Sequence, residues 1–142
     1  MTLSLTSTIN AQGAAISIDA PSSIGTQTNF VARVDIIDVT NFDACNYDIT
    51  YDPSVIEVTG ITNGLIGSTA IPVDIWSEIA PGRLRIIENV PGTPRVSGSG
   101  CLAEIHFHVI CESCDPSGIT ISNVTLSDNT ATEIQVTLMQ HQ

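Results

Sequence analysis

Glu104, His106 and His108 alternate along one stretch of the chain, with a single residue between neighbours. Side chains at positions i and i+2 of a β-strand point to the same face of a sheet. Imidazole and carboxylate groups are common zinc ligands, and Asp48 could supply a further ligand from a neighbouring strand. The spacing therefore permits a zinc site, although an ordinary polar strand face gives the same alternation and is the interpretation that we favour.

The chain has four cysteines, Cys45, Cys101, Cys111 and Cys114. Cys111 and Cys114 form a lone Cys-x-x-Cys pair, whereas a zinc site of four cysteines needs two such pairs. No βαβ pattern supports a redox motif. We expect a structural disulfide that uses Cys111 and Cys114, although four cysteines allow three pairings and the sequence does not choose between them. Cys45 lies at an inward position, which also suits a buried free thiol.

Two pairs of acidic residues, Asp38 with Asp43 and Asp128 with Glu133, carry the oxygen ligands that calcium prefers. Neither pair fits the Asp-x-Asp-x-Asp-Gly loop, and we expect these side chains to cap turns instead. The sequence also lacks the Gly-x-Ser-x-Gly, phosphate-loop and His-Glu-x-x-His motifs. Fifteen acids leave a glycosidase pair open, but a small sandwich rarely supplies the necessary cleft, so we expect no enzyme.

The charge balance excludes two classes of partner. The chain of 142 residues has fifteen acidic residues, four arginines and no lysine, for a net charge of −11. It cannot form the basic stripe that nucleic acids or anionic membrane surfaces require. No segment approaches the roughly 20 apolar residues that span a bilayer, and the first residues do not resemble a signal peptide. Either the protein stays in the cytosol, or it is a domain of a larger secreted protein. The acidic, threonine- and serine-rich, lysine-free composition favours the second alternative, so we expect a location outside the cell or at a cell surface.

The residues that could do chemistry must be positioned by strands. Threonine, valine and isoleucine, which favour strands, make up about a third of the chain. Short runs rich in these residues recur at roughly 10–15-residue intervals between turn residues, which indicates antiparallel strands in two packed sheets. The expected strands are Ala15–Asp19, Asn29–Ile37, Ala44–Tyr51, Val55–Ile61, Ala70–Ile79, Arg83–Val90, Cys101–Ile110, Ile119–Leu126 and Glu133–Leu138.

Three stretches carry a resemblance to a known family. They are Phe42-Asp-Ala-Cys-Asn-Tyr-Asp-Ile-Thr-Tyr51-Asp52-Pro53, Gly100-Cys-Leu-Ala-Glu-Ile105-His-Phe107-His-Val109 and Ser127-Asp128-Asn129. In this order they resemble the cohesin domain, whose pattern has a strand ending in Tyr-Asp-Pro and a later strand of the form Gly-x-Leu-x-x-Ile-x-Phe-x-Val. The resemblance covers residues 14–138. It implies an all-β, nine-stranded jelly-roll sandwich in a single domain, with residues 1–13 as a leader or extra strand and 139–142 as a tail.

The resemblance also implies a function. Cohesins are non-catalytic modules that bind dockerins, small helical modules loaded with calcium, and so attach proteins to scaffolds or cell surfaces. Cohesin-like domains also occur in large secreted proteins outside cellulose-degrading complexes. We therefore expect a dockerin-type protein partner and no cofactor in this chain, with calcium held by the partner.

In cohesins the dockerin lies on the outward residues of the third, fifth, sixth and eighth strands. By motif, these correspond to Ala44–Tyr51, Ala70–Ile79, Arg83–Val90 and Cys101–Ile110. Trp76 has two open interpretations, an exposed hot spot or a side chain that turns inward past a bulge. The partner-binding residues implied are Asn46, Asp48, Thr50, Asp74, Trp76, Arg83, Arg85, Ile87, Glu104, His106 and His108.

Two other classes of function stay open. Related jelly rolls bind carbohydrate through exposed aromatic rows, and here Trp76 alone falls outside the inward positions. A structural subunit of a surface layer or filament is the third class. Residues 1–13 could add a strand to the sheet of a neighbouring copy, which would give a homo-oligomer.

Overall fold

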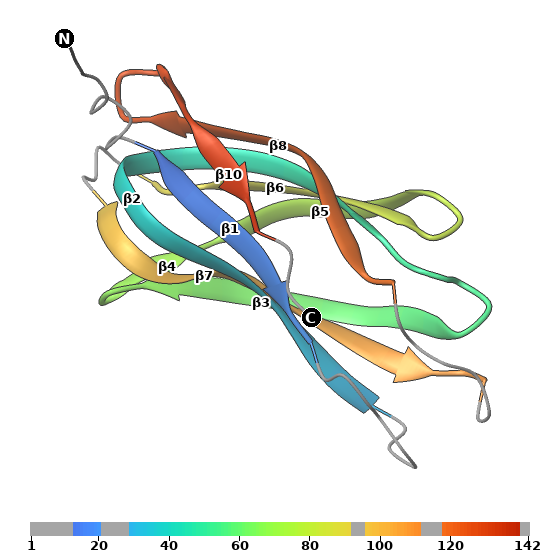
Figure 1. Ribbon diagram of the computed structural model, residues 1–142. Coiled ribbons are helices and arrows are strands. Elements are labelled where there is room, and N and C mark those ends of the chain that lie inside the picture. Colours follow the sequence, from blue (N-terminus) through green and yellow to red (C-terminus); the bar gives the residue numbers. More distant parts are fainter. Residues whose placement is uncertain (1–12, 21–28, 92–95, 112–117, 140–142) are drawn as a thin grey trace, which may run out of the picture.

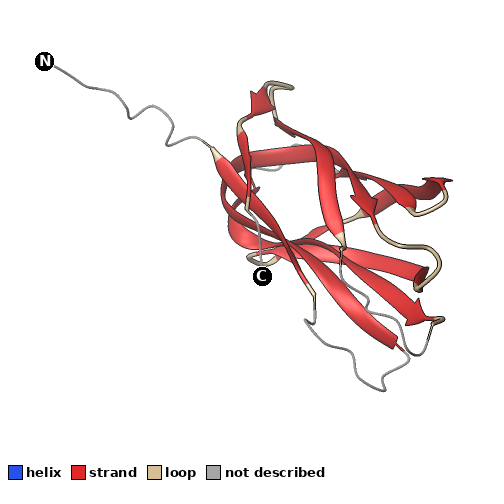
Figure 2. Ribbon diagram, turned by 45° about the vertical axis from the view of Figure 1, so that its right-hand side comes forward, coloured by secondary structure: helices blue, strands red, loops and turns tan. Residues whose placement is uncertain are grey.

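The computed structural model describes residues 13–20, 29–91, 96–111 and 118–139. These residues form ten strands and no helix, so the expected all-β fold is confirmed (Figure 2). None of the described residues forms a helix that could cross a membrane. The strands are β1 (Ala14–Asp19), β2 (Asn29–Thr50), β3 (Ile56–Ile66), β4 (Thr69–Ile71), β5 (Val73–Ala80), β6 (Arg83–Asn89), β7 (Val96–Val109), β8 (Thr120–Asp128), β9 (Glu133–Ile134) and β10 (Val136–Leu138).

Strand β2 belongs to both layers of the sandwich. Its first half pairs with β1 and β7, and its second half pairs with β6 and β8. One layer, the β7 sheet, has the order β10-β1-β2-β7-β3-β4, and the other, the β6 sheet, has the order β5-β6-β2-β8-β9. Figure 1 shows β2 curving from one layer into the other. The expected strands Asn29–Ile37 and Ala44–Tyr51 are therefore two halves of one strand.

The passage of β2 between the layers depends on two residues with left-handed backbone. Asp38 and Asn41 have φ values of 59° and 55°, and asparagine and aspartate tolerate this conformation better than most residues. Two serines of β7 support the passage. Ser99 Oγ accepts the amide of Asp38 at 3.1 Å, and Ser97 Oγ accepts the amide of Asn41 at 3.0 Å. Asp38 thus serves the bend of the chain.

One strand pair departs from the antiparallel arrangement that the sequence predicts. β1 and β10 run parallel, with Ala14 opposite Val136 and Ile16 opposite Leu138. Every other pair among the described residues is antiparallel. The sequence pattern could not reveal this, because β1 and β10 lie at opposite ends of the chain.

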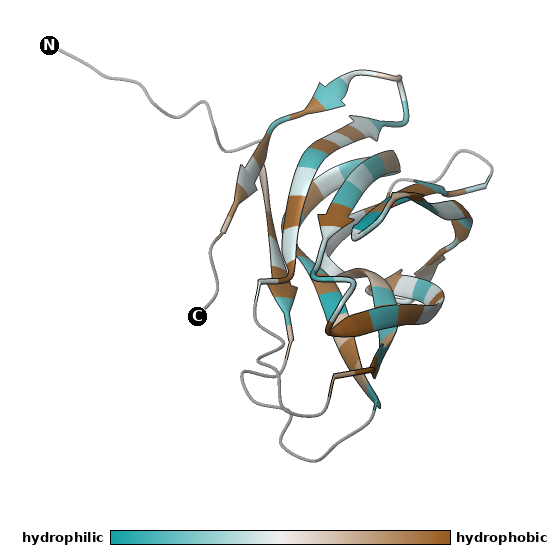
Figure 3. Cartoon of the chain, turned by 90° about the vertical axis from the view of Figure 1, so that its right-hand side faces the viewer, coloured by the Kyte–Doolittle hydropathy of each residue, from teal (hydrophilic) through white to brown (hydrophobic). Residues whose placement is uncertain are grey.

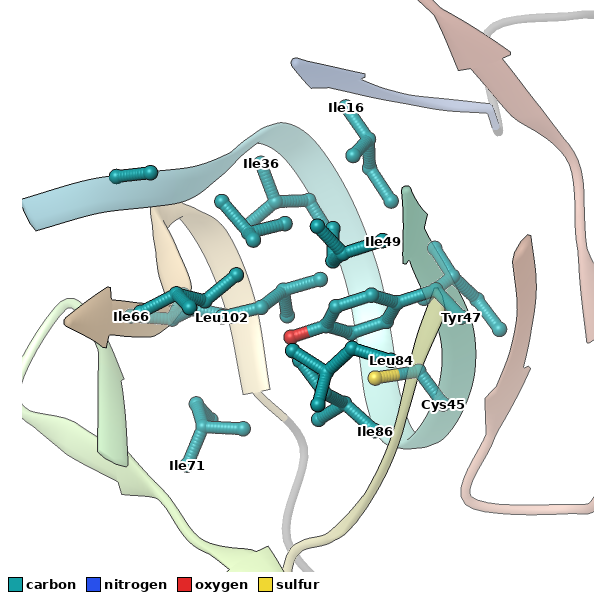
Figure 4. Close-up of a cluster of buried hydrophobic side chains, with 14 of the residues drawn as sticks. Ile16, Ile36, Cys45, Tyr47, Ile49, Ile66, Ile71, Leu84, Ile86 and Leu102 are labelled. Atoms are coloured by element: carbon teal, nitrogen blue, oxygen red, sulfur yellow. The ribbon is translucent and has the colours of Figure 1, made fainter. Parts of the chain in front are cut away.

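The core lies between the two sheets and follows the alternation of apolar residues (Figure 3). Cys45, Tyr47, Ile49 and Tyr51 are all buried, as the alternation along Ala44–Tyr51 predicts. Figure 4 shows Tyr47 among isoleucine and leucine side chains from both layers. The Phe107 ring stacks at 5.3 Å on Phe30 and meets Tyr51 edge-on at 5.4 Å, which ties the β7 sheet to the end of β2.

Candidate partner-binding face

The outward side of the β6 sheet, which we call the outer face, is built by β5, β6, the second half of β2 and β8. On β6, Leu84, Ile86 and Glu88 are buried, so the residues between them point outward. The described side chains gathered on this face include Asn46, Asp48, Thr50, Ile75, Ser77, Arg83, Arg85, Ile87, Thr120, Ser122 and Thr125. The structure therefore brings together six of the residues expected in the site, Asn46, Asp48, Thr50, Arg83, Arg85 and Ile87.

Asp48 lies at the centre of this face beneath the two arginines of β6. Arg85 donates to both carboxylate oxygens at 2.8 and 3.0 Å, and Arg83 donates to Oδ2 at 3.0 and 3.1 Å. Asn123 of β8 donates from Nδ2 to the same oxygen at 3.0 Å. The backbone of Asn123 is left-handed, with a φ of 53°. The register explains this cluster, because Asp48 pairs directly with Arg85 on β6.

The arginines keep Asp48 charged and cover it. Hydrogen bonds from Arg85 above all, and also from Asn123 and Arg83, hold the pKa of Asp48 well below its usual range despite its burial. The Asp48 side chain is 1% exposed, whereas those of Arg83 and Arg85 are 40% and 48% exposed. Asp48 was expected to contact a partner directly. It instead fixes the two arginines that a partner can reach.

The expectation that Asp74 and Trp76 share an outward face is wrong. Val73 pairs with Glu88, but the next paired residue is Ile75, opposite Ile87, so a bulge at Asp74 shifts the alternation. Ile75 therefore points outward and is 59% exposed. The extra residue also reverses the direction in which the next side chain of β5 points.

Trp76 turns inward, which is the second of its two interpretations. It pairs with the buried Ile86 and lies on the side of β5 that faces the other sheet, but it stays 38% exposed and is not among the side chains packed against the core. Asp74 accepts a hydrogen bond at 2.7 Å from Asn89, an exposed residue of β6. The bulge thus replaces tryptophan by Ile75 as the large apolar group on the outer face.

Glu104, His106 and His108 lie in the other layer. They belong to β7, which pairs with the first half of β2 and with β3, and not with the strands of the outer face. The prediction that these three residues lie on the same face as Asp48 is therefore wrong. Strand β8 occupies the position in the sheet that was expected for Cys101–Ile110. Alternation predicts which residues share one face of a strand, but it does not predict which sheet receives the strand.

The described residues contain no group of three or more His, Cys, Asp or Glu side chains arranged to hold a metal ion. His106 Nε2 lies 3.2 Å from Thr62 Oγ1, and Glu104 accepts from the same hydroxyl at 3.4 Å. His108 Nδ1 instead lies 3.1 Å from the Asn29 side chain. These contacts fit the polar strand face that the sequence favoured.

The calcium candidate at Asp128 also proves to be a turn. Asp128 Oδ1 accepts the amides of Thr130 and Thr132 at 2.9 and 3.0 Å, together with the Thr130 hydroxyl at 2.7 Å. This is the capping role expected for aspartate in such a loop. The backbone hydrogen bonds also lower the pKa of Asp128.

The cysteines divide into two groups. Cys45 and Cys101 are free, and Cys45 is buried as the sequence allowed. Cys111 takes part in a disulfide, while its expected partner Cys114 lies outside the described residues.

Sequence reasoning missed a buried polar cluster beneath the outer face. Glu88 is fully buried, and its Oε1 accepts the Tyr47 hydroxyl at 2.9 Å and the Cys45 thiol at 3.6 Å. Its Oε2 has no hydrogen-bond partner among the described residues. Burial raises the pKa of Glu88 to about 8, so this carboxyl is largely protonated at neutral pH. The alternation along Arg83–Val90 places Glu88 inward and was the available signal.

The cohesin domain family model matches residues 14–142. The chain belongs to the cohesin family. Among solved structures, the sixth cohesin of scaffoldin B from Acetivibrio cellulolyticus, in complex with a mutant Cel5 dockerin, has a TM-score of 0.72 at 18% identity, over 89% of this chain and 94% of that one. Curated proteins give no match.

Two further structures extend the comparison to other sources. A type I cohesin–dockerin complex from Clostridium thermocellum has a TM-score of 0.72 at 14% identity, over 95% of this chain and 94% of that one. A non-cellulosomal cohesin from the archaeon Archaeoglobus fulgidus has a TM-score of 0.65 at 15% identity, over 89% and 86%. This cohesin therefore has the expected jelly-roll sandwich.

Proposed function

We propose that this cohesin binds a dockerin-type protein module through its outer face and catalyses no reaction. Membership of the cohesin family supports the proposal most directly. Two of the similar solved structures are cohesins in complex with dockerins. The structural observation that carries the choice of surface is the arginine pair fixed over the buried Asp48.

The outer face combines an apolar anchor with prearranged charge. Ile75 is 59% exposed beside Ile87 on the neighbouring strand, and such exposed apolar groups commonly anchor interfaces. Arg85 is held in place by Asp48, so binding costs little additional side-chain entropy. Asn46 and Thr50, both on β2, are exposed on the same face. A complementary partner presents carboxylate or carbonyl groups to Arg85 and an apolar side chain to Ile75.

The finer parts of the proposal concern the biological setting. The partner carries calcium, which keeps its helices folded, and binding attaches proteins to a scaffold or a cell surface outside the cell. The acidic, lysine-free composition supports this setting. Assembly through residues 1–13 stays a prediction, since residues 1–12 lie outside the described part.

Carbohydrate binding is the weaker candidate. The aromatic residues Phe30, Phe42, Tyr47, Tyr51 and Phe107 are buried, so the described part of the domain has no row of exposed rings. Trp76 faces inward and contributes nothing to the outer face.

Isothermal titration against dockerin modules from the same source, with and without EDTA, tests the proposal. We expect calcium-dependent binding that weakens at least about tenfold in Ile75→Ala and in Arg85→Ala, because Ile75 is the most exposed large apolar side chain of the face and Arg85 is held over Asp48 near its centre. His106→Ala, in the other sheet, is the matched control and keeps wild-type affinity. If no dockerin binds, or if His106→Ala weakens binding as much as the two outer-face variants, the proposal is wrong.

A further inference from the structure

A pocket lies at one end of the sandwich, between the start of β3, the end of β2 and the inward side of β5. Its volume is about 480 Å³, within the range of known ligand sites. It does not belong to the outer face, because Trp76 and Glu78 enter it from the opposite side of β5. Its lining includes Tyr51, Glu57, Val58, Trp76, Glu78 and Ile110.

The charged groups of this pocket are all acidic. Its lining has two carboxylates, Glu57 and Glu78, and no basic side chain among the described residues. The Tyr51 hydroxyl and the Gly82 amide both donate to Oε2 of Glu78. Glu78 Oε1 therefore has no donor within the described part of the chain and can accept from a ligand. Burial above all, then the hydrogen bond to Glu78 and the negative charges of Glu78 and Glu57, raise the pKa of the Tyr51 hydroxyl.

The remaining wall is apolar and partly open to solvent. Trp76 is 38% exposed and Ile110 is 47% exposed, although both are large apolar residues. A lysine or arginine side chain combines an aliphatic stem with a cationic head, so it matches an indole and aliphatic wall that ends in carboxylates. A neutral apolar ligand would offer no donor to Glu57 or to Oε1 of Glu78, and an anion would be repelled by both carboxylates.

The neighbouring backbone favours a ligand carried by an extended chain. Within the described residues, β5 pairs with β6 along one edge and has no strand on the other. An exposed strand edge can pair with an extended segment, whose alternate side chains then point toward one side of the sheet. We propose that this pocket binds an arginine or lysine side chain from an extended segment of a protein partner.

Trp76 is the only tryptophan of the chain, so its fluorescence reports directly on the pocket. The probe is the blocked peptide acetyl-Thr-Val-Arg-Val-Thr-amide, titrated to millimolar concentration at low salt. Its control is the same peptide with citrulline, which keeps the shape of arginine without the charge. We expect a saturable change with the arginine peptide and at least about tenfold weaker binding of the citrulline peptide, because a charge-assisted hydrogen bond is lost.

Protein variants separate the pocket from the overall acidic charge. Glu78→Gln and Glu57→Gln each weaken arginine-peptide binding at least about fivefold, whereas Glu133→Gln, an exposed residue of β9, leaves it unchanged. Thermal unfolding of each variant establishes that it is folded. If Glu78→Gln does not fold, Glu57→Gln alone tests the role of the carboxylates. The proposal is overturned if the two peptides bind equally well, or if Glu133→Gln weakens binding as much as the pocket variants do. It is also overturned if no saturable change is seen, or if a neutral cello-oligosaccharide saturates the signal instead.

Discussion

Asp48 and Glu88 are two buried carboxylates on opposite sides of the same sheet, with opposite protonation states. Arginine donors surround Asp48 and keep it ionised. Glu88 receives only a phenol and a thiol, and burial keeps it largely protonated at neutral pH. The difference arises from their donors, since charged donors offset the loss of hydration that neutral donors cannot.

Glu88 should make the stability of the domain depend on pH. Its pKa is about 8 in the folded chain, against an ordinary value of 4.5. Between these values the folded state holds a proton that the unfolded state has released, so stability falls as pH rises, by up to about 1.4 kcal/mol per pH unit. Above pH 8 this loss is complete. Glu88→Gln removes that slope, which urea unfolding between pH 5 and 9 measures.

Glu133→Gln is the control for that experiment, because Glu133 is exposed. It should keep the wild-type slope. A Glu88→Gln variant that retains the full pH dependence would contradict the assignment of the slope to Glu88.

Asp48 gives the opposite dependence. Its folded pKa lies below its ordinary value of 3.8, so it contributes stability at higher pH that is lost as the pH falls below about 4. Asp48→Asn removes the charged acceptor of Arg83 and Arg85, and we expect a loss of about 1–3 kcal/mol at pH 7. Urea unfolding at pH 7 and pH 3 measures both effects. Thr50→Ala, at an exposed neighbouring position, is the control and should change neither value. If Asp48→Asn is as stable as the wild type at pH 7, the stabilising role of Asp48 is refuted.

At the level of the strands, two glycines allow β3 and β7 to lie close together. A Cβ atom at Gly64 would approach the Cys101 carbonyl oxygen, and one at Gly100 would approach the Leu65 carbonyl oxygen, each to well under 3.0 Å. Backbone atoms cannot move aside as a flexible side chain can. Gly64→Ala and Gly100→Ala should therefore each destabilise the domain by about 1–3 kcal/mol, as measured by thermal unfolding.

Gly60→Ala is the matched control, because nothing lies within 4 Å of a Cβ added there. Gly60 belongs to the same strand, β3. An effect of Gly60→Ala as large as that of Gly64→Ala would show that glycine flexibility matters here and not the close approach.

The predictability of the strands differs from that of their pairing. Inward positions such as Tyr47 and Ile49 follow from local alternation, and the structure confirms them. The burial of Asp48 depends on the register with β6, and the orientation of Trp76 depends on one bulge residue. Both features arise from pairing between distant segments. The outer face could thus be predicted in part, and the assignment of β7 and β8 to their sheets could not.

For the whole molecule, the sharing of β2 should make the two sheets unfold together. The Phe42–Thr50 part of β2 cannot lose its pairing with β6 and β8 without releasing Cys45, Tyr47 and Ile49 from the common core. We expect a single transition with the same midpoint by Trp76 fluorescence, which reports on β5, and by amide exchange of β7. Distinct midpoints would show that the sheets are separate cooperative units.

The parallel pair of β1 and β10 determines how the domain responds to tension. A pull on the chain ahead of β1 and behind β10 draws the two strands in opposite directions along their common axis. The hydrogen bonds from Ala14 to Gln135 and from Met139 to Ile16 then carry the load in shear and at the same time. Strands loaded in this way must break several bonds at once before they slide, so this pair acts as a mechanical clamp.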